Sequence, residues 1–367
     1  MSLRLAALGN SKIQSYQGSS TEVTLQLSTD PVKVKPKVFG DNFAPTSFSF
    51  IGQALLVDQK HQMRIPVRVI AATNSVKGLL PGQKIVVQAK VVKSKERRVA
   101  ALLIVGKKVT VINDASQWAR LLAHIRQGLR VASGGGDAGA LIPGMVIGDT
   151  SKQSEDFKNE MRRSGLTHLV AVSGANFAIV SAFVLWGMQF IFRRTNYRLL
   201  ATALALAAFI ALVRPSPSVL RAAAMAAVLL AAHASRRGRD SLPALGFAIA
   251  AVVLLDPFQA RDPGFALSVL ATAGLLLYAP RVTNFFARGV TKLLAQAAAP
   301  PIAAMVFCAP VIVAIAGYLS PMSIIANLFA APAVAPITIV GFVAALISPI
   351  APQVSMVLVN LVKPMAW

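Results

Sequence analysis

The stretch Thr167–Val180, THLVAVSGANFAIV, places a histidine, a serine and an asparagine at the start of a long apolar run. His168 and Ser173 are residue types that can serve as a general base and a nucleophile. Five residues of helix, however, turn one side chain about 140° from the other, and no nearby carboxylate is placed to orient the histidine. The pattern favours pore lining or hydrogen bonding between helices, with Asn176 on the face of Ser173.

Two further charges occur where they are costly. Arg221 lies inside the apolar run PSVLRAAAMAAVLLAAH, and such a charge usually faces the interior of a helix bundle or water. The alternative is an arginine near the outer end of a span whose side chain reaches the interface. Asp149, in MVIGDTS, is predicted either to cap the next helix or to hold an arginine near a channel mouth.

Other polar residues flank apolar runs. Asp256, Arg261 and Asp262, around LLDPFQARDPGF, are expected in an outer loop, where they can pair with one another. Asn327, in ANLFAAP, is expected to satisfy backbone groups freed by the prolines or to line a path.

The sequence lacks the residue patterns of a phosphate-binding loop, a disulfide and a metal site. GLLPGQK resembles a phosphate loop without having its spacing. The single cysteine, Cys308, excludes an internal disulfide and a cysteine-cluster metal site. The four histidines form no metal-ligand pattern: His61, His124, His168 and His233. We therefore expect a protein that is not an enzyme and has no cofactor and no metal.

Composition divides the chain into two parts. Hydrophobic residues make up 55% of it and the mean hydropathy is +0.61, well above a soluble domain. Residues 1–130 carry 20 of the 37 Lys and Arg but only 6 of the 14 Asp and Glu. We predict an N-terminal basic β domain with an amphipathic helix (1–132), a Gly-rich linker (133–140) and a multi-pass helical membrane domain (141–367).

The first part alternates apolar and polar residues in short runs. In MRIPVRVI, Met63, Ile65, Val67 and Val69 share one face, and Arg64 and Arg68 the other. Similar runs are TEVTLQL, KIVVQAKVV, RRVAALLIV and KKVTVI. This spacing predicts a small barrel, preferably a five-stranded OB-like one. The following SQWARLLAHIRQGLR is predicted to lie at a membrane surface or to pack on the barrel.

The second part contains a short helix capped by Ser154 and stopped by Gly165, followed by apolar runs. Spans are predicted near 169–192, 199–213, 217–234, 242–255, 264–279 and 297–319, with one or two more in 321–367. Several are short or interrupted by Pro and Gly, as in PPIAAMVFCAP. This predicts helices that are buried among others or broken around a cavity.

Charges in the loops predict an orientation. Nine basic residues occupy alternate loops, namely Arg193, Arg194, Arg198, Arg236, Arg237, Arg239, Arg281, Arg288 and Lys292, against Arg214 and Arg261 in the others. This bias predicts that the basic domain faces away from the cytoplasm. An outward domain without a signal peptide needs an upstream helix. Either the chain is a fragment or a late-start product, which we favour, or the predicted orientation is wrong.

Five stretches resemble ComEC-type competence proteins, over roughly 141–350 and more loosely in the barrel region. They are LIPGMVIGDTS, RRSGLTHLVAVSGANFAIV, RPSPSVLRAAAMA, LLDPFQARDPGFALSVLATAGLLL and YLSPMSIIANLFAAPAVAP. Asn176 stands where many members have histidine. The resemblance implies a channel for single-stranded DNA across the cytoplasmic membrane in natural transformation. The alternatives are a small-solute permease and an intramembrane enzyme.

The resemblance also implies partners: single-stranded DNA, membrane lipid, an extracytoplasmic DNA receptor, a cytoplasmic helicase-like ATPase and a separate nuclease in place of a C-terminal metallo-β-lactamase-like domain. The expected channel-lining or motif residues are Asp149, His168, Ser173, Asn176, Ser218, Arg221, Asp262, Ser268 and Asn327. The expected DNA-binding residues of the barrel are Arg64, Arg68, Lys90, Lys93, Lys95, Arg97 and Arg98. Stacking candidates are Tyr16, Phe39, Phe43, Phe48 and Phe50, although phenylalanine in a barrel is more often core.

Overall fold

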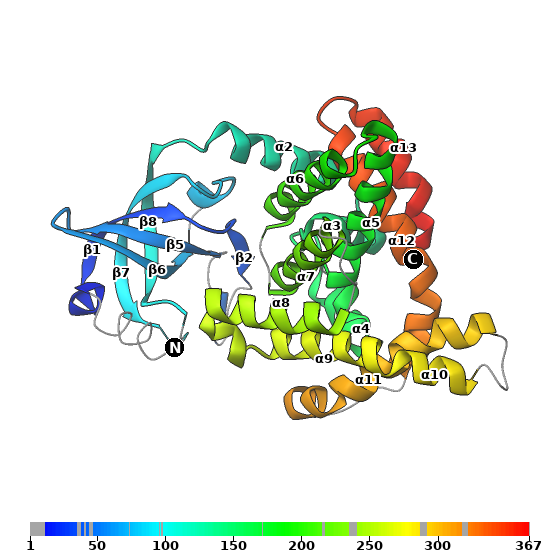
Figure 1. Cartoon of the computed structure of the whole chain (residues 1–367). Coiled ribbons are helices and arrows are strands. Elements are labelled where there is room, and N and C mark those ends of the chain that lie inside the picture. The colour runs from blue at the N-terminus through cyan, green and yellow to red at the C-terminus, as the bar shows by residue number, and fades with distance from the viewer. Residues whose placement is uncertain are drawn as a thin grey trace. The chain divides into compact units, whose positions relative to one another are not determined.

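The computed structural model describes residues 12–34, 38–39, 42–43, 47–72, 74–94, 96, 98–170, 172–214, 217–234, 241–286, 292–317 and 322–366. The chain forms two compact units, Met1–His124 (the barrel unit) and Ile125–Trp367 (the helical unit), as Figure 1 shows. The division falls inside helix α2 (Gln117–Ala132), not at 133–140, and α3 (Gly136–Ile147) takes up the second half of that expected linker.

The barrel unit is a closed five-stranded barrel with the expected OB-like form. Its strands are β1 (Ser20–Leu27), β5 (Ser47–Val57), β6 (His61–Ala71), β7 (Lys84–Lys93) and β8 (Ala101–Asn113). They follow the order β1-β7-β8-β6-β5, and the pairing of β1 with β5 closes the barrel. Only the β6–β8 pair among these is parallel. β2 (Val32–Val34) extends β5, and β3 (Val38–Phe39) pairs with β4 (Asn42–Phe43).

The alternating pattern fills the barrel as predicted. Val67 and Val69 are fully buried, with Met63 and Ile65 packed against the same core, while Arg64 on the opposite face is exposed. Two strand assignments were wrong: β5 was missed, and RRVAALLIV and KKVTVI are not separate strands, because β8 runs through both.

Two of the barrel aromatics belong to the core. Phe48 and Phe50 are buried, so their rings are not presented for stacking on bases. Tyr16 packs against the same cluster but is only partly buried. Two phenylalanines, Phe39 and Phe43, have side chains outside the described part of the structure.

The helical unit consists of α-helices joined by short 3-10 turns and loops. Its helices after α2 and α3 are α4 (Glu155–Arg163), α5 (Gly174–Ile191), α6 (Thr195–Val213), α7 (Pro217–Ala234), α8 (Ser241–Leu255), α9 (Pro263–Leu277), α10 (Ala279–Phe286), α11 (Lys292–Ala316), α12 (Met322–Ile347) and α13 (Pro352–Val362). Short 3-10 turns are η3 (Thr167–Leu169), η4 (Pro257–Arg261) and η5 (Lys363–Ala366). Ser154 caps α4 as predicted, accepting a hydrogen bond from the Phe157 amide at 3.0 Å.

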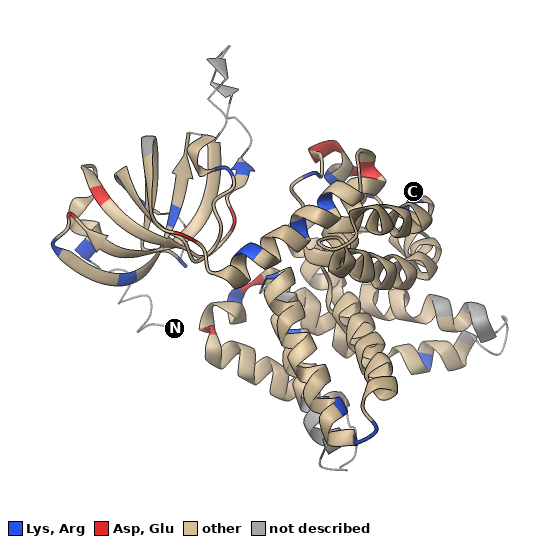
Figure 2. Cartoon of the chain, turned by 90° about the horizontal axis from the view of Figure 1, so that it is seen from above, with Lys and Arg blue, Asp and Glu red and all other residues tan. Residues whose placement is uncertain are grey.

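Four described helices are long and apolar enough to cross a membrane, and the bent pair α9–α10 makes a fifth if it is one span. Large apolar side chains point outward from them and their neighbours, including Phe190, Leu254, Leu255 and Phe329, each more than two-thirds exposed. Figure 2 shows that the described helices of the helical unit carry few charged residues. Outward apolar side chains on uncharged helices are typical of contact with lipid.

The two helices that were predicted to be broken are continuous, and the bend lies in another part of the helical unit. α11 continues through Pro300, Pro301 and Pro310, and α12 through Pro332 and Pro336. Proline is tolerated in such helices because neighbouring groups satisfy the freed carbonyls. The 45° bend instead follows α9, at Tyr278.

Candidate functional site

The start of α5 is where three of the quoted motifs meet. The span expected at 169–192 begins later than predicted: η3 ends at Leu169, and α5 starts only at Gly174. Ser173 is the N-cap of α5, and its Oγ accepts a hydrogen bond from the Asn176 amide at 3.2 Å. His168 lies in η3 with an exposed side chain, so the helical spacing assumed between His168 and Ser173 does not exist.

Asn176 joins α5 to α3. Its side chain is fully buried, and its Nδ2 donates to the Met145 carbonyl at 3.0 Å. Its Oδ1 has no hydrogen-bond partner among the described residues. Nearby, Gln153 Nε2 donates to the Val170 carbonyl at 2.7 Å, which holds the turn before α5 against the segment after α3.

Two glycines allow this close packing. Gly148 ends α3 with φ +68°, and a Cβ there would lie 3.2 Å from the Val213 carbonyl at the end of α6. A Cβ on Gly144 would lie 2.4 Å from the Val170 carbonyl. A backbone carbonyl cannot accommodate a Cβ at 2.4 Å, so Gly144 is required where α3 contacts the turn before α5. At Gly148 it is the positive φ that favours glycine.

Arg221 lies against the first residue of α5. It is only 3% exposed, and a Cβ on Gly174 would be 3.1 Å from its Nη2. Arg221 Nε and Nη1 are buried and have no hydrogen-bond partner in the described structure. The prediction that Arg221 faces the bundle interior is therefore favoured over an arginine reaching the interface.

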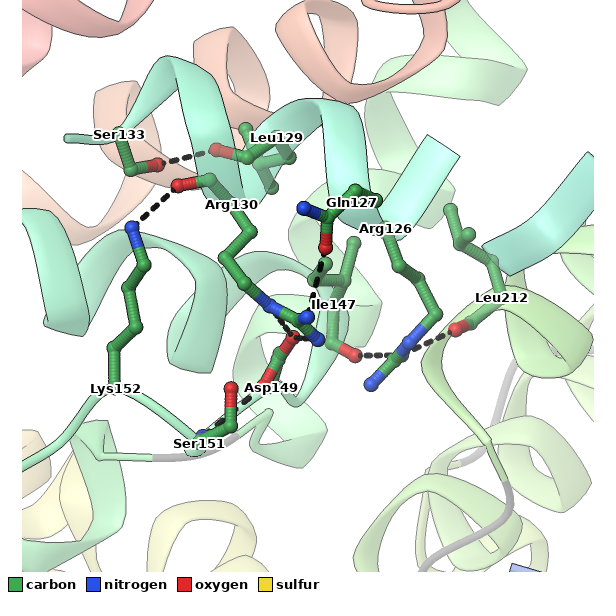
Figure 3. A network of polar contacts seen from close by, with 10 residues as sticks. All are labelled: Arg126, Gln127, Leu129, Arg130, Ser133, Ile147, Asp149, Ser151, Lys152 and Leu212. Atoms are coloured by element: carbon green, nitrogen blue, oxygen red, sulfur yellow. Dashed lines mark hydrogen bonds and ion pairs between the residues drawn. The ribbon is translucent and has the colours of Figure 1, made fainter. Parts of the chain in front are cut away.

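Asp149 holds an arginine, and does not cap the next helix. Its carboxylate, 5% exposed, accepts from Arg130 Nε at 2.8 Å and pairs with Nη2, and its Oδ1 accepts from the Ser151 amide at 3.0 Å (Figure 3). Burial alone would raise the pKa of Asp149. The hydrogen bond from Ser151 and the ion pair with Arg130 outweigh burial and lower the pKa of Asp149 below its ordinary value.

Arg126 is a residue that the sequence did not single out. It is buried on α2, and its Nη1 donates to the Ile147 carbonyl at 2.6 Å and to the Leu212 carbonyl at 2.7 Å (Figure 3). Both carbonyls belong to the last turn of a helix, where acceptors lack intrahelical partners. A cation at this place is also attracted to the negative C-terminal ends of two helix dipoles. Arg126 therefore holds α2, α3 and α6 together.

The remaining predicted residues act within their own segments. Asp262 caps α9 by accepting from the Phe265 amide at 3.0 Å, and Asp256 caps η4. Asn327 Nδ2 donates to the Ser323 carbonyl of its own helix at 2.7 Å, which is not one of the carbonyls that Pro332 and Pro336 leave free. Ser268 lies on α9, and its carbonyl accepts from Thr272. Ser218 lies in the first turn of α7, with its side chain outside the described structure.

The described members of the predicted DNA-binding set lie on β6, on β7 and in the connection between β7 and β8. Arg64 and Arg68 point outward from β6, with Arg64 bonded to Gln53 and Arg68 to Ser49 on β5. Exposed Lys93 and Arg98 flank the β7–β8 connection, and Lys90 is exposed on β7. Lys95 and Arg97 lie outside the described residues.

An acidic residue also reaches this face. Glu96, from the β7–β8 connection, pairs with Arg68 Nε at 2.7 Å. OB-type barrels bind oligonucleotides on the face of their second and third strands and on the loop between the fourth and fifth, which correspond here to β5, β6 and the β7–β8 connection.

Known proteins resemble mainly the helical unit. A family model described as "Competence protein" matches residues 145–367. ComE operon protein 3 of Bacillus subtilis (strain 168) is 26% identical over 141 residues, which are 38% of this chain and 18% of that protein. The chain thus matches less than a fifth of the length of this relative. No solved structure matches the chain.

Proposed function

This chain belongs to the competence protein family, and from that premise we propose that it conducts single-stranded DNA across the cytoplasmic membrane during natural transformation. The observation that carries the proposal is the pairing, in one chain, of an OB-like barrel with basic residues on its oligonucleotide-binding face and a unit with helices able to span a membrane. A small-solute permease or an intramembrane enzyme would need the barrel only as an accessory domain, whereas in this proposal it binds the transported strand.

Electrostatics favours this use of the barrel. Arg64, Arg68, Lys93 and Arg98 offer charges that replace the counterions of a phosphate backbone, which makes binding favourable and dependent on salt. The positive-inside bias supports an extracytoplasmic barrel, where it meets incoming DNA. In this arrangement the barrel receives the strand, from an extracytoplasmic DNA receptor, before the helical unit does.

Transport against the membrane potential needs a motor. Moving one negatively charged phosphate toward the negative interior of the cell costs about 2.3 kcal/mol for each 100 mV of membrane potential. We therefore propose that a cytoplasmic helicase-like ATPase pulls the strand and that a separate nuclease removes its complement. Ser173 takes no part in catalysis in this proposal, because its hydroxyl caps α5.

Removing either partner of the Arg68–Glu96 pair should change the affinity of the barrel for DNA, in opposite directions. Arg68→Gln should weaken binding of an oligothymidylate to the full chain about threefold to tenfold and should reduce the slope of log affinity against log salt by about 0.7. Glu96→Gln should strengthen binding by a similar factor, because it frees Arg68 and removes a repelling carboxylate. Fluorescence anisotropy of the detergent-solubilised protein at several salt concentrations measures both.

Lys77→Gln serves as the matched control, because Lys77 is an exposed basic residue in the turn that follows η2 (Asn74–Val76) and is not part of β5, β6 or the β7–β8 connection. Affinity and salt slope that are the same in wild type, Arg68→Gln and Glu96→Gln would contradict DNA binding at this face. The oligonucleotide would then have to bind elsewhere on the chain.

A further inference from the structure

We propose that Arg221 and the N-terminus of α5 form a binding site for one phosphodiester monoanion. The assignment of this group to the backbone of a transported strand rests on the proposed function, whereas the site itself rests on the geometry below.

The first observation is a buried charge two of whose nitrogens have no hydrogen-bond partner among the described residues. Arg221 is 97% removed from solvent, since its exposure is 3%, yet Nε and Nη1 donate no hydrogen bond among the described residues. Leaving a buried donor unpaired costs about 1–3 kcal/mol, and more when the group is charged. A fold that keeps such a group inside a helical bundle needs a ligand to satisfy it.

The second observation is the helix end that Arg221 faces. α5 is 18 residues long and has no acidic residue in its first turn. The Ser173 hydroxyl satisfies the Asn176 amide, and the Ser173 carbonyl satisfies the Phe177 amide. The Gly174 and Ala175 amides have no intrahelical acceptor, because they come first in the helix. Such amides, together with the helix dipole, favour an anion.

Gly174 brings these two groups together. A side chain there would approach Arg221 Nη2 to 3.1 Å, and a neighbouring methyl group, that of Ala222, lies 3.7 Å from the same point. Because residue 174 has no side chain, the guanidinium can lie over the backbone at the first turn. An anion beside it can then reach the planar N–H groups of Arg221 and the amides of α5 at once.

The three acidic residues of the quoted motifs have partners of their own. Asp149 pairs with Arg130, while Asp256 and Asp262 cap η4 and α9. The positive charge of Arg221 is therefore available to a ligand. A phosphodiester can accept two parallel hydrogen bonds from a guanidinium, as a carboxylate can. The proposed function selects the phosphodiester, because the transported strand supplies it. Ala175 is exposed, which gives a ligand a route to this helix end.

The test uses a thiol beside the site. Full chain carrying Cys308→Ala and Ala175→Cys is purified in a maltoside detergent, which contains no phosphate. We expect an oligothymidylate of about twelve nucleotides to slow modification of the introduced thiol by an anionic methanethiosulfonate about tenfold. The same oligomer with uncharged methylphosphonate linkages should not protect the thiol.

Variants assign the protection to Arg221. Arg221→Gln should abolish it and Arg221→Lys should keep part of it, while Arg261→Gln, at an exposed arginine of η4, should keep all of it. Protection that persists in Arg221→Gln, or that the uncharged oligomer also gives, would overturn the site. Protection by short-chain phosphatidylglycerol but not by the oligonucleotide would overturn the assignment to DNA.

Anisotropy on the same samples separates the two proposals. If the oligonucleotide binds the chain in a salt-dependent way but does not protect the thiol, the site at Arg221 is wrong and the proposed function stands. If the oligonucleotide neither binds nor protects, both are wrong.

Discussion

Replacing Arg221 by methionine is expected to lower DNA uptake about 100-fold without lowering the stability of the helical unit. Loss of charge-assisted hydrogen bonds to a phosphate accounts for a factor of this size. Stability should hold or increase, because methionine removes two buried donors that have no described partner and fills a similar volume. Uptake of marked DNA by a deletion strain that carries the variant, and thermal unfolding of the purified protein, measure the two effects.

This combination separates a ligand-binding arginine from a structural one. A structural arginine would lose stability and uptake together when it is removed. Arg261→Met is the matched control and should change neither quantity, because Arg261 is exposed. A clearly lowered unfolding temperature in Arg221→Met, or uptake at the wild-type level, would contradict a functional role for Arg221.

Asp149→Asn is expected to destabilise the helical unit by about 2–3 kcal/mol at neutral pH. Removing one partner of a buried ion pair typically costs about 3–5 kcal/mol, and solvent reduces this here because Arg130 is one-third exposed. Thermal unfolding at several pH values measures the difference. Asp137→Asn, at an exposed carboxylate in the first turn of α3, is the control and should cost much less.

The pH dependence follows from the direction of the Asp149 shift. The pKa of Asp149 is lower in the folded protein than in the unfolded chain, so the pair stabilises the fold above the unfolded pKa of about 4. That contribution disappears as the pH falls through the lower, folded pKa. Wild type and Asp149→Asn should therefore differ at pH 7 and converge in acid, whereas a constant difference would show that the carboxylate charge is not what stabilises the fold.

Local patterns predicted much of the barrel. Alternation in MRIPVRVI places Val67 and Val69 inside and Arg64 outside, as the structure has them. Strand β5 was missed because serines and a glycine weaken its signal, although Phe48 and Phe50 mark its inner face. Serine and glycine have a low β-strand propensity. The pairing of this segment with β1 and β6 is what makes it a strand.

The site was predictable only in part. The sequence Ser-Gly-Ala-Asn carries the signature of a helix start, and reading Ser173 as an N-cap would have placed the break before α5. Nothing local distinguishes Arg126 from Arg120 on the same helix. Its role depends on Leu212, which lies 86 residues away in the chain and becomes a neighbour only through packing.

The contact between Arg221 and Gly174 likewise depends on tertiary packing and could not be predicted from the local sequence. The sequence shows a charge in an apolar run, and two outcomes are compatible with that pattern, a buried charge or one that reaches the interface. The packing of α7 on the start of α5 favours the first.

Photo-crosslinking during uptake tests the passage of DNA through the helical unit most directly. A benzophenone amino acid at Ala175, in cells taking up labelled DNA, should capture the incoming single strand, because Ala175 is exposed beside Arg221. The same probe at Leu254, an outward apolar position on α8, should capture lipid and no DNA. Continued uptake without capture at Ala175, or equal capture at both positions, would contradict a path for the strand past the start of α5.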